Sequence, residues 1–255
     1  MRVAVLEKNG DRGWFALDGD RARRFDGSPF DGARLGSIEI AWSSADLRAP
    51  VRPSKIICIG RNYAAHAKEH GVEPPKEPLL FLKPPSAVIG PGDAIVLPKE
   101  SKRVEHEAEL GVVIGRRVKR ATREGALAAI YGYTCVCDVT ARDLQRSDGQ
   151  WSRAKGFDTF CPVGPWVETE LDPSNLAITC AVDGTVRQSG RTSQMIFDIP
   201  TLIAYASAAM TLEPGDLLVT GTPEGVGPVE PGNRITITID GIGELAVGVV
   251  DGAGS

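Results

Sequence analysis

Three acidic residues stand close together in the segment RVEHEAELGVVIG, residues 103–115, just ahead of an apolar tail. Side chains alternate between the two faces of a strand, so Glu107 and Glu109 would share one face, with Cβ atoms about 6.5–7 Å apart. Two carboxylates at that spacing repel each other unless a cation lies between them. A divalent cation held by both is one interpretation, and an exposed edge strand with solvated glutamates is the other.

A further carboxylate, Asp138, closes the apolar run YTCVC and, in strand alternation, lies opposite the two cysteines of that run. Its alternative role is to cap the following segment, TARDLQ, as a helix or turn former. Glu107, Glu109 and Asp138 together form an all-oxygen ligand set, which suits Mg²⁺, Mn²⁺ or Ca²⁺ rather than zinc or copper. Three protein ligands leave coordination positions open for substrate oxygens, as in catalytic metal sites.

The three histidines of the chain, His66, His70 and His106, all lie in two charged segments. On a helix through NYAAHAKEHG, His66 and Glu69 are three residues apart and share a face. A carboxylate that orients a histidine is the usual construction of a general base. A solvated pair on the surface of the helix is the alternative.

The glycine-rich segment GTPEGVG, residues 221–227, follows the strand-like run DLLVT. It does not match G-x-G-x-x-G, and Pro223 lacks an amide that a phosphate cradle would use, so nucleotide binding is not predicted. Glycines at this turn let the backbone and Thr222 approach a small anion closely. A tight structural turn is an equally good interpretation of the glycines.

Composition excludes several classes of protein. The chain has 255 residues, 42% of them hydrophobic, and a net charge of −4, which predicts a large core and no general attraction to nucleic acid or anionic membranes. No signal peptide and no run of about 20 apolar residues is present, so we expect a cytoplasmic protein. The five cysteines lack a C-x-x-C pair and are interpreted as small buried hydrophobic residues.

These candidate residues need strands and short helices to hold them. Residues 1–50 predict a small N-terminal β-rich lobe, and residues 51–255 a second domain that begins after a proline-bracketed linker. Strand-like runs dominate the second part, with helical stretches at NYAAHAKEH, TREGALAAIYG and IPTLIAYASAAM. Because strands and helices do not alternate regularly, we predict a β-rich α+β fold instead of a Rossmann fold or a barrel.

Seven segments in order resemble the fumarylacetoacetate hydrolase superfamily, in its branch of acylpyruvate hydrolases and 2-hydroxyhepta-2,4-diene-1,7-dioate isomerases. They cover roughly residues 55–250 and read GRNYAAHAKEHG, FLKPPSAVIGPGD, HEAELGVVIG, DVTARDLQ, AKGFDTFCPVGPW, TSQMIFDIPTLIAYAS and LEPGDLLVTGTPEGVGP. The resemblance implies a mixed β-roll catalytic domain, a homodimer, a role in aromatic catabolism and bound Mg²⁺ or Mn²⁺, with Ca²⁺ in some members.

The resemblance also implies roles for particular residues. The metal ligands would be Glu107, Glu109 and Asp138. The catalytic residues would be His66, Glu69 and Lys155. The substrate would be bound by Arg61, Arg142, Gln145 and Thr222.

The leading functional hypothesis is a metal-dependent hydrolase that cleaves a C–C bond in acylpyruvates or related β-diketo acids through a metal-bound enolate. An isomerase or decarboxylase of 2-hydroxymuconate-type compounds or oxaloacetate would use the same site without an attacking water. A non-catalytic metal-binding scaffold is disfavoured, because chemically competent residues occupy all the candidate positions. Each enzymatic hypothesis predicts a small keto acid as the partner molecule.

Overall fold

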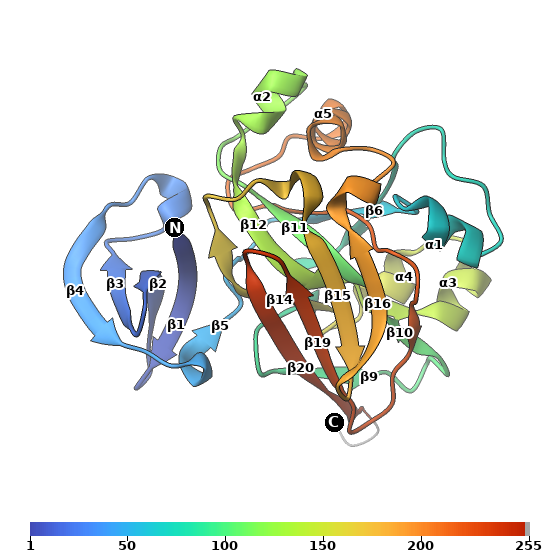
Figure 1. Cartoon of the computed structure of the whole chain (residues 1–255), viewed down its shortest axis with the longest axis horizontal. Helices are drawn as coiled ribbons and strands as arrows, with labels where there is room; N and C mark the ends of the chain where they lie inside the picture. The colour runs from blue at the N-terminus through green and yellow to red at the C-terminus, as the bar shows by residue number, and fades with distance from the viewer. Residues whose placement is uncertain (253–255) are drawn as a thin grey trace.

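The computed structural model describes residues 1–252, and its largest sheet has twelve strands (Figure 1). Ten of them lie side by side in the order β4 (Leu35–Ala41), β3 (Arg21–Phe25), β2 (Asp11–Asp18), β1 (Arg2–Lys8), β14 (Cys161–Glu168), β12 (Ile130–Cys137), β11 (Ala108–Ile114), β17 (Leu217–Val219), β6 (Ile56–Gly60) and β7 (Leu79–Lys83). Two short strands complete it, β5 (Leu47–Arg48) beside β1 and β8 (Val88–Ile89) beside β14.

Two smaller sheets accompany the large one. The five-stranded sheet has the order β16 (Thr185–Arg191), β15 (Ala177–Val182), β19 (Arg234–Ile239), β20 (Gly243–Asp251) and β9 (Ala94–Leu97). The three-stranded sheet consists of β13 (Thr140–Ala141), β10 (Val104–His106) and β18 (Gly227–Pro228). β15 pairs with β16 and β19 with β20 as antiparallel hairpins, and an Asp-Gly pair lies in each turn, as is common in hairpins.

The helices are short and lie outside the sheets (Figure 1). They are α1 (Ala64–Glu69), α2 (Arg123–Leu127), α3 (Arg142–Asp148), α4 (Ser152–Gly156) and α5 (Ile199–Ala209). Single 3₁₀ turns occupy Pro29–Asp31, Ser44–Asp46, Pro85–Ala87, Pro173–Asn175 and Thr192–Gln194. The prediction of a β-rich α+β fold is confirmed, and none of the helices in residues 1–252 is long and apolar enough to cross a membrane.

Strand alternation divides the core into two layers. Leu110 and Val112 of β11 pack in one cluster with Ile178 and Ile237, from strands of the five-stranded sheet. On the opposite face of β11, Val113 packs in a second cluster, which also contains Val136 and Val163 from β12 and β14. All five cysteines are buried with free thiols, as the sequence predicts.

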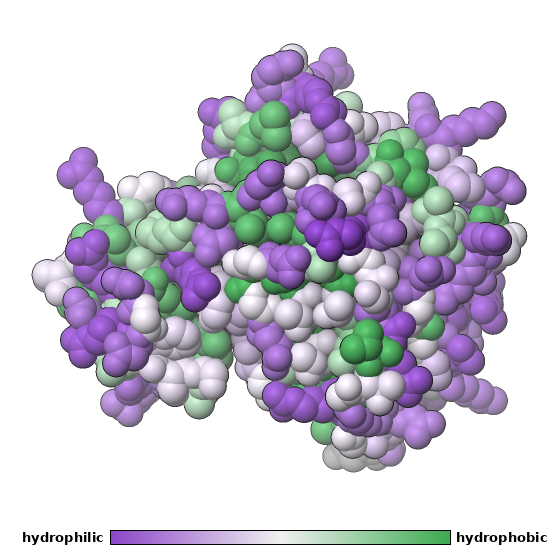
Figure 2. Space-filling view, viewed as in Figure 1, coloured by the Kyte–Doolittle hydropathy of each residue, from purple (hydrophilic) through white to green (hydrophobic). Residues whose placement is uncertain are grey.

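The N-terminal lobe has a small core of its own and forms a separate bulge at the left of Figures 1 and 2. The sheet is nevertheless continuous, because β1 pairs with β14 through Arg2 and Val3 opposite Glu168 and Val167. The terminal ammonium of Met1 lies 2.8 Å from Glu168 Oε1 and anchors the chain start to the larger part. A domain boundary at residue 50 stays a prediction.

Candidate active site

A cavity of about 310 Å³ lies where α1, α3 and α4 cover the ends of β6, β11 and β12. All ten site residues predicted from the sequence line it. They are Arg61, His66, Glu69, Glu107, Glu109, Asp138, Arg142, Gln145, Lys155 and Thr222. Ile59, Gly60, His70, Phe81, Arg146 and Trp151 complete the lining.

The register of two neighbouring strands brings the three carboxylates together. Glu109 of β11 stands opposite Val136 of β12, and the amide of Asp138 donates a hydrogen bond of 2.9 Å to the carbonyl of Glu107. Oxygen atoms of Glu107, Glu109 and Asp138 therefore lie within 4.8 Å of one another. All three residues are at most 4% exposed, which rules out the alternative of a solvated edge strand.

One detail of the prediction was wrong. The strand does not run through Glu107, because it breaks there into β10, ending at His106, and β11, starting at Ala108. The break lets β10 leave the large sheet for the three-stranded one, where it pairs with β13 and β18. Glu107 lies at the junction, and its side chain still reaches the face that carries Glu109.

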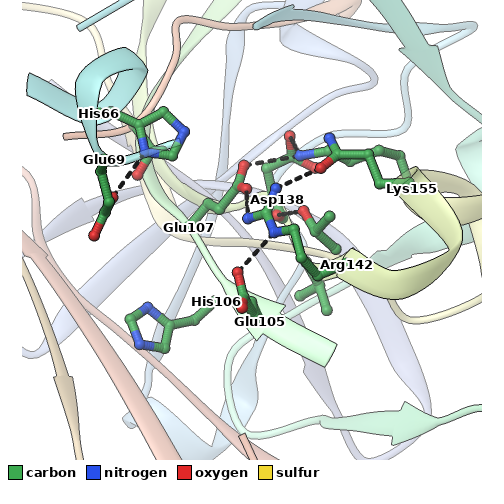
Figure 3. A network of polar contacts seen from close by, with 12 residues as sticks. His66, Glu69, Glu105, His106, Glu107, Asp138, Arg142 and Lys155 are labelled. Carbon is green, nitrogen blue, oxygen red and sulfur yellow. Dashed lines mark hydrogen bonds and ion pairs between the residues drawn. The ribbon is translucent and has the colours of Figure 1, made fainter. Parts of the chain in front are cut away.

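Cationic side chains compensate two of the three carboxylates (Figure 3). Lys155 Nζ donates to Glu107 Oε2 at 2.8 Å and to Asp138 Oδ2 at 2.6 Å. A guanidinium nitrogen of Arg142 donates to the other oxygen of Glu107. Burial alone would raise the pKa of Glu107, but Lys155 and Arg142 hold it well below the ordinary value. Asp138 does not cap a helix, since α3 begins only at Arg142.

Glu109 has a different environment. The backbone amide of Gly221 donates to Glu109 Oε2, and Gly221 has a φ of 98° with Asn62 packed where a Cβ would lie. Burial, followed by repulsion from Asp138 and Glu107, raises the pKa of Glu109 well above its ordinary value. Three buried carboxylates, one of them repelled by the other two, form a ligand set that suits a hard divalent cation.

The histidine–glutamate pair is formed on α1. Nδ1 of His66 lies 3.2 Å from Glu69 Oε2, and the amide of Gly225 donates to Glu69 Oε1 at 3.1 Å. His66 is only 5% exposed and faces the cavity, so the alternative of a solvated surface pair is wrong. Figure 3 shows His66 and Glu69 to the left of Glu107, with Arg142 and Lys155 to its right.

Several residues predicted to contact substrate already have protein partners. Arg142 Nε donates to Glu105 Oε2 at 2.7 Å, and another of its nitrogens donates to Gln145 Oε1 at 2.6 Å. The hydroxyl of Thr222 donates to the carbonyl of Ala108 at 2.9 Å, so it is not free to donate to a substrate carboxylate. Arg61 has a φ of 58° and lies 5.7 Å from the ring centroid of Trp151.

Sequence reasoning missed two buried polar residues beneath the site. Lys83 Nζ donates to Asp138 Oδ1 at 2.6 Å and to the carbonyl of Val139 at 3.0 Å. Gln188 Nε2 donates to Thr222 Oγ1 at 2.8 Å, and its oxygen accepts from the amide of Ala108 at 2.9 Å. The available signals were weak: a lysine before a proline in FLKPP, and a glutamine in a strand of mixed polarity.

We expect Lys83→Met to lower the free energy of unfolding by about 3 kcal/mol, the low end for breaking a buried ion pair, because buried Asp138 then keeps only Lys155 of its two lysine partners. Lys83 is not among the described residues that line the cavity and would act on the site through Asp138, so turnover of the folded variant should fall by about 10–100-fold, the usual effect of losing the partner of a metal-ligating side chain. Urea denaturation and steady-state kinetics measure the two quantities. Unchanged stability would show that Lys83 contributes nothing to holding Asp138.

The family described as fumarylacetoacetate (FAA) hydrolase, C-terminal, matches residues 55–250. Mitochondrial oxaloacetate tautomerase of Rattus norvegicus is 45% identical over 223 residues, which cover 83% of this chain and 71% of that protein.

Two solved structures are also similar to this chain. The 5-carboxymethyl-2-hydroxymuconate delta-isomerase of Mycobacterium smegmatis superimposes with a TM-score of 0.91 at 45% identity, covering 98% of this chain and all of that one. Fumarylpyruvate hydrolase of Pseudomonas aeruginosa, solved with Mn²⁺ and pyruvate, gives a TM-score of 0.74 at 40% identity, covering 79% and 91% of the two chains. The chain therefore belongs to the fumarylacetoacetate hydrolase superfamily and is an enzyme.

Proposed function

We propose that this enzyme hydrolyses a C–C bond in acylpyruvates or related β-diketo acids. The observation that carries the proposal is the position of the His66–Glu69 pair, which lines the same cavity as the three carboxylates. Hydrolysis needs a base to activate water, and a histidine oriented by a carboxylate is suited to that task. Similarity to a fumarylpyruvate hydrolase supports the same reaction class.

Glu107, Glu109 and Asp138 would hold the divalent cation, either Mg²⁺ or Mn²⁺, with Ca²⁺ also compatible with an all-oxygen set. When bound, the cation supplies Lewis-acid stabilisation of negative charge on substrate oxygens. The similar structure that contains Mn²⁺ and pyruvate supports both the cation and a keto-acid substrate.

His66 would act as the base. In the tautomer that donates its Nδ1 proton to Glu69 Oε2, the other ring nitrogen carries a lone pair. That nitrogen takes a proton from water, and the resulting hydroxide attacks the acyl carbonyl carbon. The electron pair of the broken C–C bond stays with the pyruvate fragment, whose carbon then receives a proton. Products are a carboxylic acid and a pyruvate-type keto acid.

Lys155 and Arg61 would interact directly with the substrate. Asp138 and Glu107 raise the pKa of Lys155 above its ordinary value despite the opposing effect of burial, so its ammonium stays protonated and can stabilise developing negative charge. Arg61, placed against Trp151 at the cavity wall, is suited to bind a carboxylate of the substrate. Gln145, bonded to Arg142, and Thr222, bonded to the carbonyl of Ala108, would form part of the cavity wall.

An isomerase, tautomerase or decarboxylase is the second candidate. It is favoured by the similarity to a hydroxymuconate isomerase and an oxaloacetate tautomerase. These reactions move a proton or release CO₂ from the same kind of keto acid without an attacking water. The cation ligands and Lys155 would then be used as in hydrolysis, and His66 would transfer protons on carbon or oxygen.

The deciding experiment is a substrate panel. Acylpyruvates, fumarylpyruvate, oxaloacetate and hydroxymuconates are assayed with the purified enzyme and added Mg²⁺ or Mn²⁺. The proposal predicts that an acylpyruvate gives the highest kcat/KM. Highest activity on oxaloacetate or a hydroxymuconate would select the second candidate. The implied homodimer is part of the proposal and is tested by light scattering.

We expect Glu109→Gln to weaken binding of Mg²⁺ or Mn²⁺ by at least about tenfold, since an amide is a poorer ligand than a carboxylate. Burial and repulsion from Asp138 and Glu107 raise the pKa of Glu109, so they disfavour its charged form without a cation, and glutamine removes that repulsion. Stability of the metal-free protein should therefore change little, while the stabilisation by added cation is reduced. Calorimetric titration and thermal unfolding measure both.

Glu105→Gln is the matched control. Glu105 is also buried but bonds Arg103 and Arg142 instead of lying in the carboxylate triad. The Glu105→Gln variant should bind Mg²⁺ or Mn²⁺ with the affinity of the wild type. Equal affinities in wild type and Glu109→Gln would remove Glu109 from the ligand set.

A further inference from the structure

A second group of ligand-type side chains lies on one turn of α1 and its C-terminal cap. His66, Glu69 and His70 are spaced i, i+3 and i+4, which puts all three on one face of the helix. One potential ligand atom from each lies within 4.8 Å of the others. This set has two imidazoles and one carboxylate, unlike the all-oxygen triad across the cavity.

One ring nitrogen of His70 lacks a partner in the part of the chain that the structure describes. Nε2 of His70 is buried and has no hydrogen-bond partner among residues 1–252. A buried polar atom without a partner is unfavourable, so this nitrogen is suited to bind a ligand. Burial, with help from Arg142 and His66, also lowers the pKa of His70. Its ring is therefore neutral at neutral pH, the form that binds metal ions.

The other two ligands are already held in place. Gly225 fixes one oxygen of Glu69 through its amide and leaves the second oxygen facing His66 Nδ1 at 3.2 Å. Two ligands about 2.0–2.2 Å from a tetrahedral Zn²⁺ are separated by roughly 3.3 Å. The observed separation therefore matches one edge of such a site. The rings of His66 and His70 are 4.6 Å apart, centroid to centroid.

We propose that His66, Glu69 and His70 form a separate inhibitory site for one borderline transition-metal cation of the Zn²⁺ class. The cation takes the place of the proton between His66 Nδ1 and Glu69 Oε2, and that proton moves to the other ring nitrogen, so that His66 binds as a neutral imidazole with no free lone pair. His66 can then no longer accept a proton from water. The binding step is independent of the proposed function, whereas the inhibition rests on it.

Ligand chemistry separates the two sites. Mg²⁺ prefers oxygen ligands and selects the carboxylate triad, while imidazole nitrogen favours Zn²⁺ and Co²⁺. With Mg²⁺ in excess, a transition-metal ion is therefore directed to α1. The divalent charge is partly balanced by Glu69, and both histidines bind as neutral ligands.

The test adds Co²⁺ to the 255-residue enzyme saturated with Mg²⁺ and records the visible absorption of the bound cobalt. We expect one equivalent to bind with the intense bands of a low-coordinate site that contains nitrogen. His70→Phe, which keeps an aromatic ring against His66, should abolish these bands. Lys68→Ala, on the exposed side of the same helix, should retain them. Bands that persist in His70→Phe, or weak bands of an all-oxygen site in wild type, would overturn the proposal.

Activity gives the second measurement. Zn²⁺ at a small excess over enzyme should lower turnover of the Mg²⁺-loaded wild type at least tenfold, and His70→Phe should resist it. Inhibition that is relieved by raising Mg²⁺ would place Zn²⁺ in the triad and overturn the site on α1. If the enzyme proves not to hydrolyse acylpyruvates, the cobalt spectrum still decides whether the site exists.

Discussion

Replacing Lys155 with methionine is expected to lower turnover by about 10²–10³-fold, the usual loss when one group that stabilises transition-state charge is removed. Methionine keeps most of the side-chain volume and loses the ammonium. Lys155 is 2% exposed and donates to both Glu107 and Asp138, so its charge lies beside the place where substrate oxygens would sit. Steady-state kinetics on the best substrate of the panel measures the loss.

The Lys155→Met variant should bind the divalent cation more tightly than the wild type does. Without Lys155, Glu107 and Asp138 face each other with less compensation, so the metal-free protein should lose about 3–5 kcal/mol of stability. A bound divalent cation restores that compensation, so its affinity should rise rather than fall. Calorimetric titration and thermal unfolding with and without Mg²⁺ separate the two effects.

A matched control is Lys68→Met, which removes an exposed lysine from α1 and should change neither quantity. Full turnover in Lys155→Met would mean that the lysine serves only to neutralise the buried carboxylates. Weakened cation binding would mean that Lys155 organises the ligand set.

The carboxylate site could be predicted from the sequence because its parts follow local rules. Strand alternation predicts that Glu109 and Asp138 lie on one face of their strands and that Cys135 and Cys137 lie on the other. The structure confirms this, because both cysteines pack in the core cluster on the opposite face. The helical spacing of His66 and Glu69 likewise fixes their contact within one turn. Each of these inferences needs only a few consecutive residues.

Long-range pairing could not be predicted in this way. Lys83 meets Asp138 across 55 residues of sequence, and Gln188 meets Ala108 across 80. The contacts depend on the parallel pairing of β17 with β6 and on how the two sheets pack, which no local pattern specifies. A buried lysine at a strand end looks like any surface lysine until its partner is known.

Strand β14 was missed for a different reason. It contains Pro162 and Pro165, and a proline cannot donate to a sheet, which argues against a central strand. The strand nevertheless lies between β1 and β12, and its register with β12 shifts between Tyr133 and Cys135. Its pairing with β1 also explains why the lobe of residues 1–50 joins the large sheet, a link absent from the sequence signals.

The largest expected effect belongs to His66. We expect His66→Ala to lower acylpyruvate hydrolysis by about 10²–10⁴-fold, the usual contribution of general acid–base catalysis. Cation binding should be unaffected, because His66 is not part of the carboxylate triad. Oxaloacetate decarboxylation, where the enzyme performs it, should fall much less, since it needs no attacking water. Parallel assays of both reactions on wild type and variant measure the difference.

Glu69→Gln refines the same test. The glutamine amide has one oxygen, so it can accept from His66 Nδ1 or from the amide of Gly225 but not from both, and it lacks the negative charge that supports a protonated imidazole. A smaller loss of hydrolysis than in His66→Ala is expected, because the base remains in place with weaker support. Equal losses of hydrolysis and decarboxylation in His66→Ala would instead assign α1 to substrate enclosure or to proton transfer common to both reactions. The hydrolase proposal would then lose the observation that carries it, and the isomerase or decarboxylase would become the better description of this site.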